Sequence, residues 1–309
     1  MAMEIAVIGA GALGTVFGGL LSDEGHDVRL LHYDAEFVDR INADGVQIYS
    51  DYLDGAPYHL DVAATTDAST VGSVDLALVF VKTPQTREAL QQHAACLGDH
   101  TRVLSLQNGL RNYEKLAEFV AEERILVGIT YEGGELRESG VVDHERGGPS
   151  IFGGQDNAFA RRVGDAFEAA NLKAEVVDDP FPAIWEKLVW AAVSKPISVL
   201  TRLPFHCLAT DDNLVRVMEN VVEETYEVAE ARGVKIQTER DEILEEIIET
   251  LENRYSYDSN LKDVRAEQRT EIADVNGAIV EYADQEGVDV TYNRVLTSLV
   301  EGLERSFEV

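Results

Sequence analysis

Positive charge is scarce in this chain of 309 residues. Lysine and arginine total 26, and only seven of these are lysine, whereas aspartate and glutamate total 57 and bring the net charge to −31. No basic patch could dominate such a field, which excludes a nucleic-acid partner and means that an anionic membrane would repel the chain. The acidic residues are spread along the whole chain. At molar salt the screening length falls to about 3 Å, so the acidic residues would repel one another little. We therefore expect a halophilic protein, with an ordinary acidic protein as the alternative.

Cysteine and long apolar runs are also rare. Cys96 and Cys207 have no CxxC spacing, so a disulfide framework is not indicated, and His206 beside Cys207 lacks the further ligands of a metal site. No apolar run reaches the ~20 residues that cross a membrane, and the N-terminus passes into a predicted strand without a signal peptide. We expect a cytoplasmic protein with no metal and no membrane partner.

Short apolar runs alternate with helical segments in the first part of the chain. These runs cover residues 4–8, 28–31, 76–81, 103–106 and 125–129. They predict an α/β domain with a Rossmann-type, doubly wound parallel sheet. Later segments have a period of 3.6 and predict long helices, over residues 183–200, 213–232, 239–252, 261–285 and 292–307.

Two nearby prolines, Pro180 and Pro182, mark the change of pattern, because proline continues neither a helix nor a strand well. We predict a dinucleotide-binding domain over residues 1–178 and an all-α substrate and dimerisation domain over residues 179–309. In such an arrangement the active site is expected in the cleft between the two domains.

A glycine-rich loop directly follows the first predicted strand and opens a helix. It reads Gly9-Ala10-Gly11-Ala12-Leu13-Gly14, which is the GxGxxG spacing of dinucleotide-binding proteins. Gly9 permits the tight turn, Gly11 the approach of the pyrophosphate, and Gly14 the packing of helix against strand. Asp34 lies twenty residues beyond the loop, where an acid commonly binds the adenosine ribose, although a solvated surface aspartate is equally expected. We predict that the six loop residues and Asp34 bind the cofactor.

Two of the seven lysines, Lys187 and Lys195, occur in the most apolar helical stretch, residues 183–200. Burying an ammonium group is costly unless it is paired, so a buried lysine is usually a structural ion pair or a tuned catalytic group. The two lysines are eight residues apart and share one helix face with Ala191. We expect the chemistry on this face.

Four further segments follow the glycine loop in order, and with it they resemble the ketopantoate reductase (2-dehydropantoate 2-reductase) family over essentially the whole chain. The segments are Val81-Lys82-Thr83, Gln107-Asn108-Gly109, Trp185-Glu186-Lys187-Leu188 and, in a predicted long helix, Thr270-Glu271-Ile272. The resemblance implies a Rossmann-type domain followed by a helical domain like the C-terminal domain of 6-phosphogluconate dehydrogenase. It also implies NAD(P)H-dependent reduction of a 2-keto acid, first of all 2-dehydropantoate, on the route to pantothenate and coenzyme A.

The resemblance also assigns roles to individual residues. Lys187 would be the general acid that protonates the carbonyl oxygen, and Glu271 would hold the substrate and the lysine. Asn108 would contact cofactor and substrate, and Ser259 the substrate carboxylate. A cationic donor suits the reaction because hydride addition leaves negative charge on oxygen. The cofactor side of the cleft would include Lys82 and Gly134.

Several positions depart from the family pattern. The lysine helix usually carries two asparagines, here replaced by Ala191 and Lys195, and two more are matched by Phe205 and Ser256. Lost hydrogen-bonding partners favour a less hydroxylated or more apolar 2-keto acid. Lys195 would either bind the substrate carboxylate or form a structural ion pair. The alternatives to 2-dehydropantoate reduction are therefore a related reductase of another 2-keto acid and a non-catalytic dinucleotide sensor.

The choice of nicotinamide cofactor depends on the end of the second predicted strand. There Tyr33 replaces the family's NADPH-binding arginine, and Asp34 would repel a 2′-phosphate, which favours NADH. The family usually uses NADPH, and Arg29 or Arg40 could serve the 2′-phosphate instead. NADPH is therefore slightly favoured over NADH. A homodimer that binds a small 2-keto acid is the expected assembly.

Overall fold

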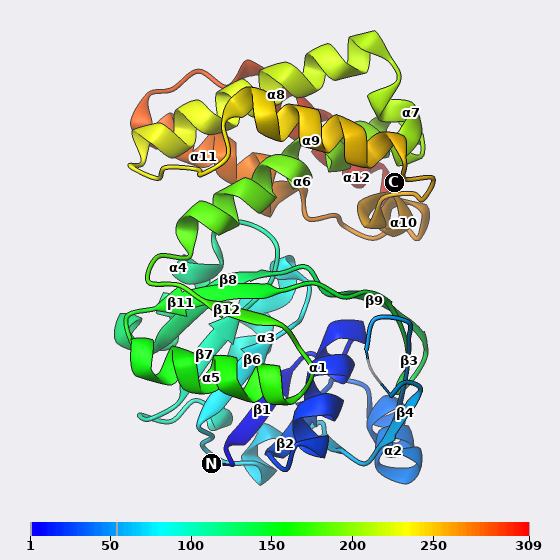
Figure 1. Ribbon diagram of the computed structural model, residues 1–309, viewed down its shortest axis with the longest axis vertical. Coiled ribbons are helices and arrows are strands. Elements are labelled where there is room, and N and C mark those ends of the chain that lie inside the picture. Colours follow the sequence, from blue (N-terminus) through cyan, green and yellow to red (C-terminus); the bar gives the residue numbers. More distant parts are fainter. Residues whose placement is uncertain (1, 54, 309) are drawn as a thin grey trace. The chain divides into compact units, whose positions relative to one another are not determined.

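The computed structural model describes residues 2–53 and 55–308, which form two compact units (Figure 1). The first unit comprises the chain up to Gln107 together with Asn112–Pro180. The second comprises Asn108–Arg111 together with the chain from Phe181 onward. The chain thus joins the second unit for four residues, returns to the first, and leaves it again after Pro180.

An eight-stranded sheet forms the centre of the first unit, in the order β12-β11-β8-β7-β6-β1-β2-β5. Neighbouring strands are parallel except β8 and β11, which are antiparallel. The predicted doubly wound sheet is confirmed, with this antiparallel pair towards one edge. The strands are β1 (Glu4–Ile8), β2 (Asp27–Leu31), β5 (Ala63–Thr65), β6 (Leu76–Val79), β7 (Arg102–Ser105), β8 (Ile125–Thr130), β11 (Ser150–Gly154) and β12 (Ala174–Val176).

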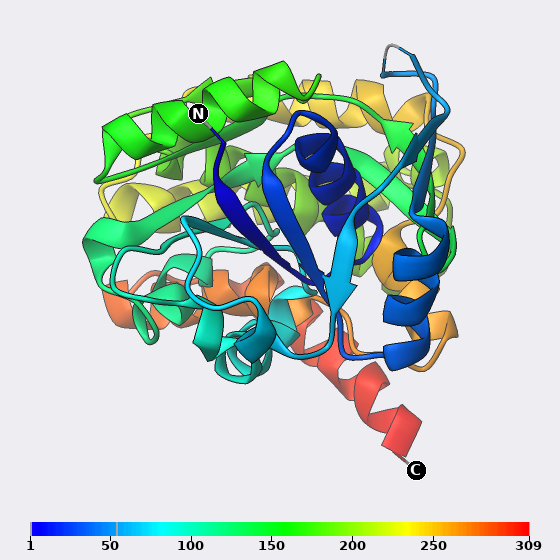
Figure 2. The ribbon, with the colours of Figure 1, turned by 90° about the horizontal axis from the view of Figure 1, so that it is seen from below.

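Helices lie on both faces of this sheet (Figure 2). Phe17 of α1 contacts Phe167 of α5 at a centroid distance of 5.2 Å, so these two helices share a face, whereas α3 lies on the other face. The helices are α1 (Ala12–Asp23), α2 (Ala35–Asp44), α3 (Thr86–Gln92), α4 (Asn112–Ala117) and α5 (Asn157–Ala169), with 3₁₀ turns η1 (Ala68–Thr70), η2 (Thr83–Gln85), η3 (Ala94–Cys96) and η4 (Glu122–Arg124).

A second, four-stranded sheet belongs to the same unit and was not predicted. Its order is β4-β3-β10-β9, and β3 pairs with β10 in parallel although they are almost a hundred residues apart in the chain. Short strands of this kind have no strong period, because their pairing partners are set by tertiary contacts. The strands are β3 (Val46–Ser50), β4 (Tyr58–Leu60), β9 (Gly133–Glu138) and β10 (Val141–Arg146).

The second unit is helical, as predicted. Its elements are α6 (Phe181–Thr201), α7 (Phe205–Ala209), α8 (Asp212–Ala231), α9 (Arg240–Glu252), α10 (Ser259–Arg265), η5 (Ile272–Asp274), α11 (Asn276–Glu286), α12 (Thr291–Arg305) and η6 (Ser306–Glu308). The single helix predicted over residues 261–285 is wrong. The chain turns at Glu267, whose φ of 54° is left-handed, and Glu271 therefore lies in a loop before η5 and not inside a helix.

Aspartate begins several of these helices. Asp34, Asp156, Asp211 and Asp258 each accept a hydrogen bond from a backbone N–H of the first turn, for α2, α5, α8 and α10 respectively. A carboxylate at this position satisfies an orphan donor and complements the helix dipole. Part of the acidic composition thus serves local structure. Within the described residues, no helix combines the length and the apolar character that a membrane crossing requires.

Candidate active site

The glycine loop connects β1 to α1 where the strand order reverses. Gly9 has a φ of +102°, and a Cβ on Gly14 would lie 2.0 Å from the carbonyl oxygen of Gly9, so both positions need glycine for the fold itself. A Cβ on Gly11 would meet no atom within 4 Å. Gly11 is also the N-cap of α1 and makes no side-chain cap bond. Open space before a helix N-terminus fits the pyrophosphate of a dinucleotide.

The remaining loop residues anchor this turn. Ala10 is buried, and the backbone N–H groups of Gly9 and Ala10 donate to the carbonyl oxygen of Leu31 at the end of β2, at 3.1 and 3.3 Å. Ala12 and Leu13 form the first turn of α1. These bonds place the loop directly beside the carboxyl end of β2, where Asp34 follows.

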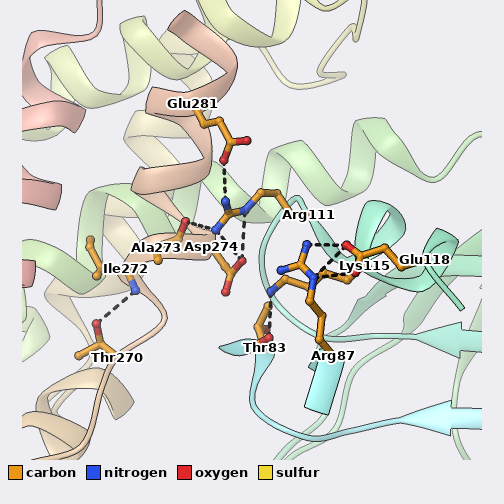
Figure 3. Close-up of polar contacts among 10 residues, drawn as sticks. All are labelled: Thr83, Arg87, Arg111, Lys115, Glu118, Thr270, Ile272, Ala273, Asp274 and Glu281. Atoms are coloured by element: carbon orange, nitrogen blue, oxygen red, sulfur yellow. Dashed lines mark hydrogen bonds and ion pairs between the residues drawn. The ribbon is translucent and has the colours of Figure 1, made fainter. Parts of the chain in front are cut away.

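The loops after β6 and β7 are tied together within the first unit. Gln107 donates to the carbonyl oxygen of Val81 at 2.5 Å and to the hydroxyl of Thr86 at 2.9 Å. Lys115, a buried lysine that the sequence analysis did not single out, donates to the carbonyl oxygen of Thr83 at 2.9 Å (Figure 3). Lys82 lies exposed between these residues at the N-cap of η2. These hydrogen bonds connect the loops at the carboxyl edge of the sheet.

Gly134 lies on β9 directly opposite His144 of β10, and His144 belongs to a buried polar chain that the sequence did not reveal. The Ser50 hydroxyl oxygen accepts N–H bonds from residues 52 and 53 and lies 2.7 Å from Nδ1 of His144. Its proton is therefore directed to Nδ1, and Nε2–H of His144 donates to Glu132 at 2.5 Å. Glu132 immediately precedes the glycine pair of β9, so this series of hydrogen bonds from Ser50 through His144 to Glu132 fixes the backbone at Gly134.

In the second unit, Glu271 receives two hydrogen bonds from predicted site residues. Its Oε2 atom lies 2.5 Å from Nζ of Lys195 and 3.3 Å from Nδ2 of Asn108. The side chains of Lys195 and Glu271 are only 12% and 15% exposed. The structure therefore brings three predicted site residues together, and in it Lys195 forms an ion pair with Glu271.

Asn108 reaches Glu271 because residues 108–111 are anchored to the chain around η5 (Figure 3). Arg111 forms ion pairs with Asp274 at 3.0 Å and with Glu281 at 2.5 Å, and it also donates to the carbonyl oxygen of Ala273 at 2.9 Å. Gly109 has a φ of +96°, and a Cβ there would lie 2.7 Å from the carbonyl oxygen of Asp274. The close approach needs glycine, which explains the Asn-Gly pair in physical terms.

The charges of this cluster are balanced. Burial raises the pKa of Glu271, but Lys195, Asn108 and the charge of Lys187 together hold it below its usual value. Burial lowers the pKa of Lys195, but the carboxylates of Glu271 and Asp258 raise it above its usual value. For Asp258, burial outweighs Lys195 and raises the pKa. Glu271 is therefore a carboxylate and Lys195 a tightly held ammonium at neutral pH.

The other predicted substrate residues lie around this cluster. Lys187 is half-buried on α6, two turns before Lys195, and its charge acts on Glu271. Ser259 is exposed as the first residue of α10, next to Asp258. Phe205 is buried under the Arg254 guanidinium at 4.4 Å from the ring centre, and its N–H donates to Ser256, so two of the departures from the family pattern are neighbours.

A buried amide network supports α6 beside Lys195. Pro196 has no N–H, so the carbonyl oxygen of Ala192 lacks its helical partner. Asn276 donates to this oxygen at 3.0 Å and also to Oδ1 of Asn293, whose own amide donates to Glu224 at 2.8 Å. The sequence does not predict this network, because Pro196 marks only the need for a donor and not its identity. Among the described residues, no group of three or more His, Cys, Asp or Glu could hold a metal ion.

Both parts of the chain match family models. The model "Ketopantoate reductase PanE/ApbA" matches residues 5–157, and its C-terminal counterpart matches residues 181–304. The chain is 32% identical to the 2-dehydropantoate 2-reductase of Halobacterium salinarum, over 98% of this chain and 99% of that one. It is 33% identical to the enzyme of the same name from Pyrococcus horikoshii, with 98% of each chain covered.

Solved structures show the same likeness. A PanE/ApbA family ketopantoate reductase from Ralstonia eutropha superposes with a TM-score of 0.91 at 31% identity, covering 99% of this chain and all of the other. A D-mandelate dehydrogenase in complex with NADH and anilino(oxo)acetate has a TM-score of 0.88 at 25% identity, with the same coverage. On the match of both family models and of relatives above 30% identity over nearly the full length, this chain belongs to the ketopantoate reductase family.

Proposed function

We propose that this protein is an oxidoreductase that reduces 2-dehydropantoate to pantoate with a nicotinamide dinucleotide, a step towards pantothenate. Relatives of that name cover almost the whole chain at about one-third identity. The observation that carries the proposal is the cluster in which Lys195 and Asn108 both bind Glu271 and Lys187 acts on it. A dinucleotide sensor would need no such cluster.

The cofactor, when bound, supplies the hydride. The first unit provides the residues that would hold it: the open position at Gly11 and the N-terminus of α1 for the pyrophosphate, with Asp34, Lys82 and Gly134 as further contacts. By the family resemblance, Asn108 would contact both cofactor and substrate. Two solved relatives are complexes with NADH, which supports a nicotinamide dinucleotide for this chain.

Lys187 is the proton donor in this proposal. Glu271 is ionised and cannot donate a proton, and Lys195 is held by two carboxylates that raise its pKa. A group whose pKa is raised further above 10.5 is a poor general acid near neutral pH, because catalysis is best when the pKa lies near the working pH. Lys187 is then the remaining lysine on the helix face, and its ammonium would stabilise charge on the substrate oxygen. Lys195 holds Glu271, and Ser259 binds the substrate carboxylate.

A second substrate class is favoured by two particular residues. Ala191 and the buried Phe205 stand where the family has asparagines, so the pocket offers fewer partners to a substrate hydroxyl. The D-mandelate dehydrogenase relative was solved with anilino(oxo)acetate, an aromatic 2-keto acid analogue. A more apolar 2-keto acid is the alternative substrate.

The test is an initial-rate assay at molar salt. NADH and NADPH are each combined with 2-dehydropantoate, 2-ketoisovalerate and phenylglyoxylate. The proposal predicts the highest kcat/KM with 2-dehydropantoate. A higher value with phenylglyoxylate would assign the alternative substrate class, and no turnover of any keto acid would leave only dinucleotide binding.

A further inference from the structure

We infer that this chain binds NADH in preference to NADPH. The carboxyl end of β2 presents the carboxylate of Asp34 to the adenosine ribose, and the nearby Arg29 and Arg40 are paired with carboxylates away from it. The inference rests on the proposed dinucleotide site and names the cofactor for it. It reverses the slight preference for NADPH that the family resemblance implied. All residues that carry it belong to the first unit.

Asp34 is fixed where a ribose would lie. The glycine loop is bonded to Leu31, the last residue of β2, and Asp34 follows three residues later. The Oδ1 atom of Asp34 accepts the N–H of Glu36 at 2.9 Å, which holds the carboxylate at the N-terminus of α2. A carboxylate here accepts hydrogen bonds from ribose hydroxyls. It also repels a 2′-phosphate, which carries a charge of about −1.5 to −2 at neutral pH, and the exposed acid Glu36 adds to the repulsion.

Arg29 is directed away from this site. Its guanidinium lies 2.5 Å from the carboxylate of Asp27 and 3.0 Å from the carbonyl oxygen of Val28. Both partners precede Arg29 on β2, so the side chain points to the amino end of the strand. It lines a cavity of about 350 Å³ there, together with His26. The cofactor edge is at the opposite end of the strand.

Arg40 is directed away as well. Its guanidinium forms an ion pair of 2.6 Å with Glu138, the last residue of β9. The turn after β9 packs on the C-terminal end of α2, since a Cβ on Gly140 would lie 3.1 Å from the carbonyl oxygen of Gly45. Asp34 is at the other end of α2. The arginine that could have met the 2′-phosphate is therefore drawn to the far end of the helix.

The residue in the family's arginine position offers a ring instead of a charge. Tyr33 is 78% exposed and stacks on His32 at 4.6 Å, and His32 stacks on Phe37 at 4.0 Å. Burial lowers the pKa of His32, more than its contacts with Asp34 raise it, so this ring is neutral at pH 7 and supplies no cation. An exposed aromatic face beside the ribose can stack on adenine. Adenine is common to both cofactors, so Tyr33 adds affinity and Asp34 makes the choice.

The experiment measures binding without substrate. NADH and NADPH are titrated into the full chain, and nicotinamide fluorescence gives each Kd, at molar salt and at the lowest salt that keeps the chain folded. We expect NADPH to bind about tenfold more weakly than NADH, with a larger ratio at lower salt because the repulsion is then less screened. Asp34→Asn should bring the ratio close to one, and Tyr33→Arg with Asp34→Asn should invert it.

Asp39→Asn is the matched control, because it removes one exposed carboxylate from the same helix and should leave the ratio unchanged. Equal or tighter binding of NADPH by the parent would overturn the inference, as would an Asp34→Asn variant that weakens both cofactors equally. Thermal unfolding of each variant confirms that it is folded. Tight NADH binding without turnover of any keto acid would leave the inference standing and refute the proposed function. Turnover of 2-dehydropantoate by a chain that binds NADPH more tightly would do the reverse.

Discussion

The two units differ in the groups that they offer to an anionic ligand. In the first unit the loop from Gly9 to Gly14 has no charged side chain, and it offers backbone N–H groups and the start of a helix. In the second unit Lys195 and Glu271 are charged and form an ion pair below the surface, with the buried Asp258 nearby. A backbone site depends on close approach, whereas a charged cluster depends on each charge having its partner. The first unit should therefore be sensitive to added volume, and the second to lost charge.

Removal of the charge of Lys187 should have the largest effect. We expect Lys187→Ala to lower kcat/KM for 2-dehydropantoate by about 10²–10⁴, because general acid catalysis contributes this much. Initial rates at molar salt measure it. Lys173→Ala removes an exposed lysine of the first unit and should leave the rate unchanged. A Lys187→Ala variant as active as that control would show that Lys187 is not the general acid.

Loss of Lys195 should destabilise the fold by about 3 kcal/mol, because it leaves the buried carboxylate of Glu271 without its ion pair. Denaturant unfolding of Lys195→Met against the parent measures this. Lys235→Met, at an exposed position of the same unit, should stay within about 0.5 kcal/mol of the parent. Equal effects of the two variants would mean that the cluster does not depend on charge balance.

The cost of losing Lys195 should depend on pH. The folded pKa of Glu271 is lowered, so its contribution is complete above its ordinary pKa of 4.5 and is lost as the pH falls below this value. The folded pKa of Lys195 is raised, so its contribution is complete below 10.5 and is lost as the pH rises above it. The difference between parent and Lys195→Met should therefore be largest between these limits. A difference that stays constant to pH 3 would contradict an ionic origin.

Added volume in the first unit should separate folding from binding. Gly14→Ala places a methyl group 2.0 Å from a backbone oxygen and should cost about 1–3 kcal/mol of unfolding free energy. Gly11→Ala faces open space, so stability should be unchanged while the Kd for the dinucleotide rises. Thermal unfolding and cofactor titration measure the two effects. Normal cofactor binding by Gly11→Ala would show that the loop does not approach the pyrophosphate.

The last effect concerns the support of α6. Asn276→Ala leaves the buried carbonyl of Ala192 without a donor and should cost about 1–3 kcal/mol. Alanine at position 196 restores a backbone N–H for the same oxygen. In the Pro196→Ala background the cost of Asn276→Ala should therefore be smaller. Additive costs in this double-mutant cycle would show that the Asn276 amide does not replace the hydrogen bond that Pro196 cannot donate.

The sequence predicted the geometry of the glycine loop well and the arrangement of the charged cluster only in part. The glycine spacing reports directly on local geometry, so the loop at Gly9, the start of α1 and the doubly wound sheet could all be predicted. Lys195 and Glu271 were both identified, but their ion pair joins residues 76 apart in the chain, and no local pattern contains that distance. The break near Glu267 was missed because its residues suit a helix, and tertiary contacts decided otherwise.

The excursion of Asn108–Arg111 has a consequence for how the protein is made and divided. Asp274 is almost fully buried, and its ion pair is with Arg111, which the ribosome delivers long before α6 is synthesised. A gene fragment that begins at Phe181 would encode every helix of the second unit and still lack the guanidinium that Asp274 requires. Such a fragment should need a peptide spanning Asn108–Arg111 in trans. The helices of the second unit form one continuous stretch of the sequence, but the unit as a whole is made from two separate stretches.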